Sequence, residues 1–209
     1  MKKILFGVCA AMVLYSCSSD RDEPIVENPA ATVQVKEVKN LKVHSAYSDG
    51  DAKNFTLYSL KENKQVDDKE LATAKWDIGF NGTTIIVNSY TRNKDAKGAA
   101  ALIEKAYEEV KEAPEDAQMK IDELVNGNYV LAIPTGSGKG WYNYDFSTHT
   151  ITPIKAKTIV IKTAEGKYAK LKIASYYKDA PEQPTNPKDL GYYTFTYAYQ
   201  TNGSKVFSK

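Results

Sequence analysis

The residues able to do chemistry in this chain are few, and their spacing favours binding over catalysis. His44 and His149 are the only histidines, and Cys9 and Cys17 are the only cysteines. These numbers are too small for a zinc-finger module or a multi-haem c-type protein. A nucleophile–histidine–acid arrangement stays open, but no spacing indicates one, and the many carboxylates single out no glycosidase pair. We therefore expect a binding protein and not an enzyme.

A glycine-rich segment at residues 134–140, PTGSGKG, has some features of a phosphate-binding loop. A P-loop requires a Gly five residues before its Gly-Lys pair and a Ser or Thr directly after the Lys. Ile133 and Gly140 occupy those two positions. Because the hydroxyl that would bind magnesium is missing, we expect a hairpin loop and no nucleotide site.

The N-terminus has the pattern of an exported and lipidated protein. Lys2 and Lys3 precede an apolar stretch at residues 4–15, which is shorter than the about 20 residues that a membrane-spanning helix needs. Residues 1–16 are therefore predicted to be a signal peptide. The sequence Leu-Tyr-Ser-Cys ending at Cys17 resembles a bacterial lipobox, in which the Cys carries the lipid. A plain secretory signal with an incidental Cys17 is the alternative.

Residues 17–32 are predicted to be the lipidated Cys17 and a flexible tether. The segment after Cys17 is polar and is broken by Pro24 and Pro29, which is typical of a linker. Its acidic residues resemble the export signal of surface-exposed lipoproteins, although a solvated linker would have the same composition. We expect a protein anchored by lipid in the outer membrane and exposed at the cell surface.

The remaining residues, 33–209, are predicted to form a single domain. The full chain of 209 residues has 28 basic and 26 acidic residues, and removal of Lys2 and Lys3 with the signal leaves 26 of each. A balanced charge excludes a strongly basic nucleic-acid-binding protein. The hydrophobic content of 42% is sufficient for a core in a domain of this size.

Alternating apolar residues predict a β-rich fold. The clearest strand is residues 192–200, where Tyr193, Phe195, Tyr197 and Tyr199 fall on one face. Two hairpins are predicted, one turning at Asn81-Gly82 and one at residues 164–166. Further strands are expected at residues 33–43, 54–60, 118–124, 129–133, 141–144 and 150–154. One short helix is predicted near residues 99–112, because Ile103, Ala106, Tyr107 and Val110 have helical spacing and Pro114 follows.

Four segments, in order, resemble the HmuY family of lipid-anchored, haem-binding bacterial proteins. They are residues 76–100, with WDIGF at the start, Asn88 and then GAA; residues 141–144, WYNY; residues 164–176, beginning AEGKYAKL; and residues 193–199, YTFTYAY. The resemblance covers most of residues 70–200. It implies an all-β, mostly antiparallel, HmuY-like β-sandwich, with haem held between extended loops.

The resemblance also implies where axial ligands to haem iron would lie. In well-known members of the family two His or two Met hold the iron, and one of them follows the strand that contains the second Trp. Here that turn is residues 145–150 and the candidate ligand is His149, although strict register falls nearer Phe146. A hydrogen-bonded His in a surface turn is the alternative reading of His149.

The second ligand of the family lies on a segment before that Trp, and the stretch at residues 114–141 is short here. Met119 is the nearest substitute, although a Met in an alternating strand is more often part of a core. Tyr142 and Tyr144 flank the turn and could stack on a porphyrin or ligate iron, with sheet packing as the alternative.

Two functions remain from this reading. The first is a haemophore-like lipoprotein that captures haem, or another porphyrin, at the cell surface and passes it to an outer-membrane transporter, for example a TonB-dependent receptor. The second is a HmuY-fold lipoprotein that has lost haem ligation and binds another small ligand or a protein partner. Neither requires nucleic acid or enzymatic activity.

Overall fold

The computed structural model describes residues 33–46, 50, 54–184 and 189–208. The predicted signal peptide, lipidated Cys17 and tether lie outside the described residues. No helix in the described part of the chain is both long and apolar enough to cross a membrane.

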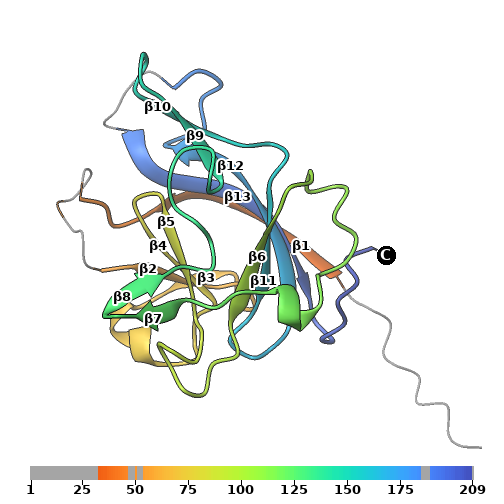
Figure 1. Cartoon of the computed structure of the whole chain (residues 1–209). Coiled ribbons are helices and arrows are strands. Elements are labelled where there is room, and N and C mark those ends of the chain that lie inside the picture. Colours follow the sequence, from red (N-terminus) through yellow and green to blue (C-terminus); the bar gives the residue numbers. More distant parts are fainter. Residues whose placement is uncertain (1–32, 47–49, 51–53, 185–188, 209) are drawn as a thin grey trace, which may run out of the picture.

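The fold is a sandwich of two antiparallel sheets (Figure 1). The larger sheet has the order β1-β13-β12-β11-β6, and its strands are Val33–Lys42, Leu190–Gln200, Tyr168–Tyr177, Thr158–Lys162 and Ala99–Ile103. The smaller sheet has the order β3-β2-β4-β5, and its strands are Lys64–Val66, Thr56–Ser59, Ile78–Asn81 and Thr84–Val87. The mostly antiparallel β-sandwich predicted from the sequence is therefore present.

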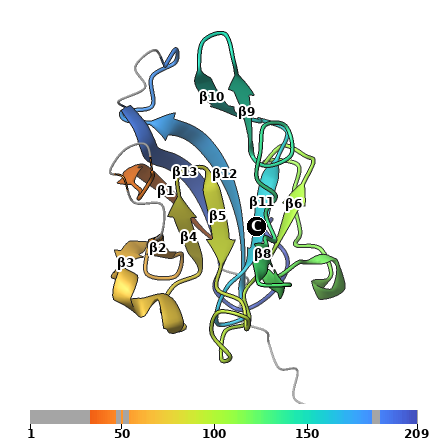
Figure 2. The same ribbon diagram turned by 60° about the vertical axis from the view of Figure 1, so that its left-hand side comes forward.

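Two separate hairpins and short 3₁₀ turns complete the described structure. One hairpin joins β7 (Glu123–Val125) to β8 (Asn128–Val130), and the other joins β9 (Tyr142–Asp145) to β10 (Thr150–Pro153). Two 3₁₀ turns are η1 (Asp68–Ala72) and η2 (Asp116–Gln118). The β9–β10 hairpin extends beyond one end of the two sheets (Figure 2).

The main core fills the space between the sheets, and the aromatic face of β13 dominates it. Tyr193, Phe195 and Tyr197 are completely buried. Phe80 of β4 packs on Tyr193 with ring centroids 4.6 Å apart, and Tyr58 of β2 meets Phe195 edge to face at 5.6 Å. These side chains share one face of β13, as the sequence predicted, and the structure places that face against the smaller sheet.

A buried carboxylate also connects the two sheets. Asp77 precedes β4 and accepts hydrogen bonds from the backbone N–H of Leu60, 2.8 Å away, and of Ala164, 3.0 Å away. Leu60 follows β2 in the smaller sheet, whereas Ala164 lies in the turn between β11 and β12 of the larger sheet. Two backbone donors that would otherwise lack partners are satisfied by one side chain.

A second apolar cluster lies on the other face of the larger sheet. Ala99 and Ala101 of β6 point into it, while Ala100 points into the main core. Val110, Ala113 and Phe207 cover this face. Met119 is buried in this same cluster.

The predicted helix near residues 99–112 is wrong. Ala99–Ile103 forms strand β6, which pairs with β11 across five residues, from Thr158↔Ile103 to Lys162↔Ala99. The chain then follows turns to Val110, whose side chain packs on the sheet. Pairing with the exposed edge of β11 satisfies backbone groups and buries the alanines, and this outweighs a local helical preference.

The two predicted hairpins are confirmed. Asn81 pairs with Thr84 around a turn that contains Gly82, whose φ is +52°. Lys162 pairs with Tyr168 around a turn that contains Gly166, whose φ is +87°. Strand prediction was less accurate at residues 118–124, where only Glu123–Val125 is a strand and Gln118 ends η2.

Candidate functional site

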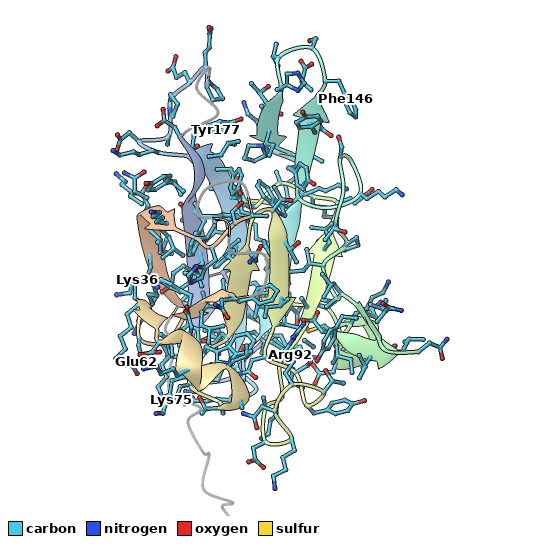
Figure 3. The ribbon with its side chains drawn as sticks, turned by 90° about the vertical axis from the view of Figure 1, so that its left-hand side faces the viewer. Lys36, Glu62, Lys75, Arg92, Phe146 and Tyr177 are labelled. Atoms are coloured by element: carbon cyan, nitrogen blue, oxygen red, sulfur yellow. The ribbon has the colours of Figure 1, made fainter. Side chains whose placement is uncertain are left out.

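The predicted site residues on the β9–β10 hairpin line one cavity of about 530 Å³. Tyr142 and Tyr144 come from β9, and Phe146 and His149 come from the turn. Phe146 lies near the tip of the hairpin, at the end of the molecule away from Glu62 and Lys75 (Figure 3). The other residues that line the cavity are Gly82, Thr83, Ser137, Ile151, Tyr176 and Leu190.

The turn that carries His149 is held by the side chain of Asp145. The Asp145 carboxylate accepts hydrogen bonds from the backbone N–H and the hydroxyl of Ser147, both at 2.7 Å. These bonds lower the pKa of Asp145, because they favour the ionised form. His149 has a φ of +55°, in the left-handed region, and returns the chain to β10.

His149 is held by a hydrogen bond to Tyr144. The Tyr144 hydroxyl lies 2.7 Å from His149 Nδ1, whereas Nε2 has no hydrogen-bond partner in the described part of the chain. If Nδ1 carries the proton and donates it to the Tyr144 oxygen, Nε2 presents its lone pair. That tautomer is the one in which a neutral imidazole ligates a metal, and its orientation is fixed by the bond at the other nitrogen.

Phe146 adds an exposed aromatic surface at the mouth of the cavity. Its ring meets that of Tyr144 edge to face, with centroids 4.9 Å apart and planes at 87°. Its side chain is 79% exposed. A large, well-oriented and exposed aromatic ring beside a cavity is a feature of binding surfaces.

The base of the hairpin is attached to the turn between β4 and β5. The indole N–H of Trp141 donates to the backbone oxygen of Thr83 at 2.9 Å, and the Thr83 hydroxyl donates to the Tyr142 hydroxyl at 3.3 Å. Trp141 is buried against Tyr176 and Tyr193. The base of the hairpin is therefore attached to the core, and β9–β10 forms a wall of the cavity.

The glycine-rich segment at residues 134–140 lies beside this wall. Ser137 lines the cavity, and its hydroxyl accepts the backbone N–H of Tyr144 at 2.8 Å. Lys139 is absent from the lining. The segment therefore supports the β9 strand instead of forming a cradle for phosphate.

The structure does not bring Met119 to this cavity. Met119 packs with Ala101, Val160 and Tyr168 on the outer face of the larger sheet, and it is absent from the cavity lining. His44 is also elsewhere, with its Nε2 2.7 Å from an Asp68 carboxylate oxygen. Within the described residues, His149 is the one His or Met that lines the cavity.

The lining is uncharged, and the volume suits a small-molecule or cofactor site. None of the described residues that line the cavity is Lys, Arg, Asp or Glu. Cavities of about 300 to 1,000 Å³ with mainly apolar and aromatic walls are typical of such sites. The arrangement can bind a flat, largely apolar molecule and offer it one imidazole nitrogen.

Sequence reasoning did not identify Thr83, Tyr176 and Leu190 as part of the site. They come from a β-turn, from β12 and from the start of β13. No local pattern distinguishes them from other residues in strands and turns. Only the pairing of β12 with β13 and the attachment of the hairpin to Thr83 bring them to the cavity.

Three solved structures of known proteins are similar to this chain at low sequence identity. An apo HmuY analogue from Tannerella forsythia is 16% identical, with a TM-score of 0.50, and the match covers 82% of this chain and 97% of that one. An HmuY-like protein from Bacteroides vulgatus is also 16% identical, with a TM-score of 0.45 and coverage of 79% and 90%. Apo PinO from Porphyromonas gingivitis is 13% identical, with a TM-score of 0.43 and coverage of 82% and 98%.

No curated relative matches the sequence. The family model described as HmuY protein matches residues 51–197, a range that contains both sheets apart from β1 and the end of β13, as well as the whole β9–β10 hairpin. By this match the chain belongs to the HmuY family.

Proposed function

We propose that this protein binds haem, or a closely related porphyrin, in the cavity beside β9–β10. His149 would be an axial ligand to the iron through Nε2, and Tyr142, Tyr144 and Phe146 would contact the porphyrin. Membership of the HmuY family supports haem as the ligand. The observation that carries the proposal is the His149 imidazole, oriented by Tyr144, at an aromatic cavity without charged residues.

The residues of this site fit haem held by one strong axial ligand. Imidazole is a common ligand of haem iron, and aromatic walls suit the faces of the macrocycle. The iron would supply the bond to the imidazole, and the protein would supply orientation and exclusion of water. Tyr142 and Tyr144 are the other residues of the cavity with iron-ligating side chains that the sequence singled out. Met119 would have to move from the second apolar cluster to take part.

We further propose that the protein acts at the cell surface. The lipobox-like sequence ending at Cys17 and the polar segment that follows it support a lipid anchor in the outer membrane and a tether. Fifteen extended residues reach roughly 50 Å, which would let the domain stand clear of the lipid. In this role the protein captures haem and passes it to an outer-membrane transporter, such as a TonB-dependent receptor, without catalysing a reaction.

A second function is favoured by the position of Met119. Because Met119 is buried in another cluster, the cavity holds one His and no Met within the described residues. A HmuY-fold protein that has lost haem ligation would keep the aromatic cavity and bind a different flat ligand or a protein partner there.

Titration with haemin distinguishes the two functions. We expect a saturable shift of the Soret band with the wild-type domain, a changed spectrum with His149→Ala, and a smaller change with Tyr144→Phe. Met119→Leu is the matched control, and we expect it to retain the wild-type spectrum. A spectrum equal to that of free haemin for the wild-type protein would exclude haem binding and leave the second function.

A further inference from the structure

A second cavity lies at the other end of the sandwich and has different chemistry. It has a volume of about 640 Å³ and is enclosed by β2 and β3, the η1 turn and the turn between β11 and β12. Glu62 and Lys75, which line it, lie at the end of the molecule opposite Phe146 (Figure 3). The two cavities have no lining residue in common.

The second cavity has buried polar side chains in its lining. Ser59, Asp77, Thr163 and Tyr199 are each at most 5% exposed. Tyr199 is on the aromatic face of β13, and its ring belongs to the main core. Its hydroxyl has no hydrogen-bond partner within the described residues, and the charges of Asp77, Glu165 and Glu62 act on it. This hydroxyl is not among the fully enclosed side-chain atoms that lack a partner, so it is reachable from the cavity that Tyr199 lines, where a ligand atom can meet it.

Asp77 contributes a buried carboxylate that interacts with the charge of Lys61 without direct ion-pair contact. Its carboxylate accepts hydrogen bonds from the backbone N–H of Leu60 and of Ala164, the backbone N–H of Lys61 acts on it as well, and it forms no salt bridge within the described part of the chain. Burial raises the pKa of Asp77 to about 6. A carboxylate has about four acceptor positions, so three backbone donors leave room for one further donor.

The rim of the cavity is acidic overall. Five carboxylates line it, those of Glu62, Asp67, Glu70, Asp77 and Glu165, together with three lysines. Two of the lysines are already paired, Lys61 with Glu165 and Lys75 with Glu70, each at 2.8 Å. The excess is local, because the whole chain has more basic than acidic residues.

We propose that this cavity binds an organic ammonium group carried on a short aliphatic stem, as in a diamine or the side chain of a lysine. The ammonium would donate hydrogen bonds to the Asp77 carboxylate and to the Tyr199 hydroxyl, and the apolar stem would lie along Val66 and Ala74 at the rim. An ammonium has three donors and no acceptor, which matches a floor made of oxygen atoms.

Other classes of ligand fit this cavity less well. An anion would meet the excess of carboxylates. A metal ion would need a cluster of ligating side chains, and no group of three or more His, Cys, Asp or Glu suited to a metal exists within the described residues. A porphyrin would face charged walls here, in contrast to the uncharged cavity at β9–β10.

Three probes of similar length test the proposal. Cadaverine carries two ammonium groups, pentane-1,5-diol is its neutral counterpart, and glutarate is its anionic counterpart. Each is titrated into the ¹⁵N-labelled wild-type protein while backbone amide signals are followed. We expect cadaverine to give saturable shifts at Leu60 and Ala164, whose N–H groups contact Asp77, and we expect no such shifts from the diol or glutarate.

Variants separate the site from general charge effects. Tyr199→Phe removes one acceptor from the core-packed ring, and we expect cadaverine affinity to fall about tenfold, the loss typical of one hydrogen bond to a charged group. Asp77→Asn should abolish binding, and Tyr199→Phe keeps the test valid if that variant is unstable. Glu123→Gln, an exposed carboxylate on β7, is the control, and both it and His149→Ala should bind cadaverine as the wild type does.

The proposal is overturned if cadaverine gives no saturable shift. It is equally overturned if the diol or glutarate binds as well as cadaverine, or if Tyr199→Phe leaves its affinity unchanged. None of these outcomes depends on haem, so they leave the function proposed for the β9–β10 cavity unaffected.

Discussion

The two ends of this sandwich differ in the kind of surface that they offer. The cavity beside β9–β10 has Tyr142, Tyr144 and Phe146 in its lining and no charged residue among those described. The cavity beside η1 has Asp77 in its floor and carboxylates and lysines around its rim. One frame, built on the aromatic face of β13, therefore carries an uncharged cavity and a charged cavity that share no lining residue.

The difference arises from how each end is covered. At the β9–β10 end a projecting hairpin brings aromatic side chains over a buried Trp141. At the other end the turn around Glu165 meets the segment from Lys61 to Lys75, and polar turn residues close the sandwich. Turn residues remain in contact with water, so charged side chains are tolerated there. The β9–β10 hairpin instead lines its cavity with aromatic side chains from β9 and the turn.

The largest effect is expected from removing Trp141, which packs beneath the residues of the aromatic cavity. Trp141 is 3% exposed and packs against Tyr142, Tyr176 and Tyr193 with ring centroids 5.0 to 6.0 Å apart. Trp141→Ala should lower the free energy of unfolding by about 3 to 5 kcal/mol, as for other large aromatic side chains in a core. Urea unfolding followed by tyrosine fluorescence measures the loss.

Trp141→Phe is the matched control for that experiment. It keeps an aromatic ring and loses the hydrogen bond to the Thr83 oxygen, so a smaller loss is expected. If Trp141→Ala costs less than about 1 kcal/mol, the fold does not depend on the packing of Trp141. The description of the uncharged end as a hairpin attached to the core through Trp141 would then be wrong.

The polar end should respond to pH through Asp77. Burial raises the pKa of Asp77 to about 6 in the folded protein, against about 3.9 in an unfolded chain. The folded state therefore holds this proton more tightly, so its stabilising contribution is complete below pH 4 and is lost as the pH rises through 6. The total is about 2 to 3 kcal/mol.

Asp77→Asn has no titrating group at this position and provides the reference. The unfolding free energy of the wild-type protein, minus that of the variant, should fall between pH 4 and pH 7.5. The same subtraction with Glu123→Gln should show little slope, because Glu123 is exposed. If this difference in unfolding free energy does not change with pH, Asp77 is ionised throughout the range. Its negative charge is then stabilised by groups other than those that line the cavity.

A smaller effect is expected at the rim of the polar cavity. The Lys61 and Glu165 side chains are 49% and 47% exposed and lie 2.8 Å apart. A double-mutant cycle with Lys61→Ala and Glu165→Ala should give a coupling energy of about 0.2 to 1 kcal/mol. A coupling well above this range would show that the pair fastens the β2–β3 turn to the larger sheet, and that the rim is as rigid as the aromatic end.

The smallest effect on stability is expected at the tip of the hairpin. Tyr144→Phe and His149→Ala change a hydrogen bond in an exposed turn, and each should alter the unfolding free energy by less than about 0.5 kcal/mol. Thermal unfolding is sufficient to measure this. A loss above 1 kcal/mol for either variant would mean that the pair maintains the turn, and changes in ligand binding could then reflect loss of structure.

The sequence predicted those parts of the fold that depend on local alternation and turns. The aromatic face of β13 and the turns at Gly82 and Gly166 follow from period-2 spacing and from glycine in left-handed conformations. Residues 99–112 were wrongly predicted as a helix, because the edge of β11 that pairs with β6 is distant in sequence. The helical spacing of the apolar residues in this segment contains no information about its pairing with β11.

The two cavities also differ in how much of their lining could be predicted from the sequence. Tyr142, Tyr144 and His149 lie within one short hairpin, so the sequence could place them together, and the structure does bring them to one cavity. Met119 was placed near them by its position before Trp141, but its side chain faces the opposite side of the larger sheet. The polar cavity combines residues from β2 to β13, and no local pattern connects Asp77 with Tyr199.

The central claim is that the His149 imidazole is a ligand of haem iron. The most direct measurement is the absorption spectrum of the haemin complex of His149→Ala, recorded before and after addition of free imidazole. We predict that the variant lacks the Soret position of the wild-type complex and that imidazole restores it, because the free molecule occupies the space that the side chain leaves. If the spectrum of His149→Ala equals that of the wild type without added imidazole, His149 is not a ligand and the claim is wrong.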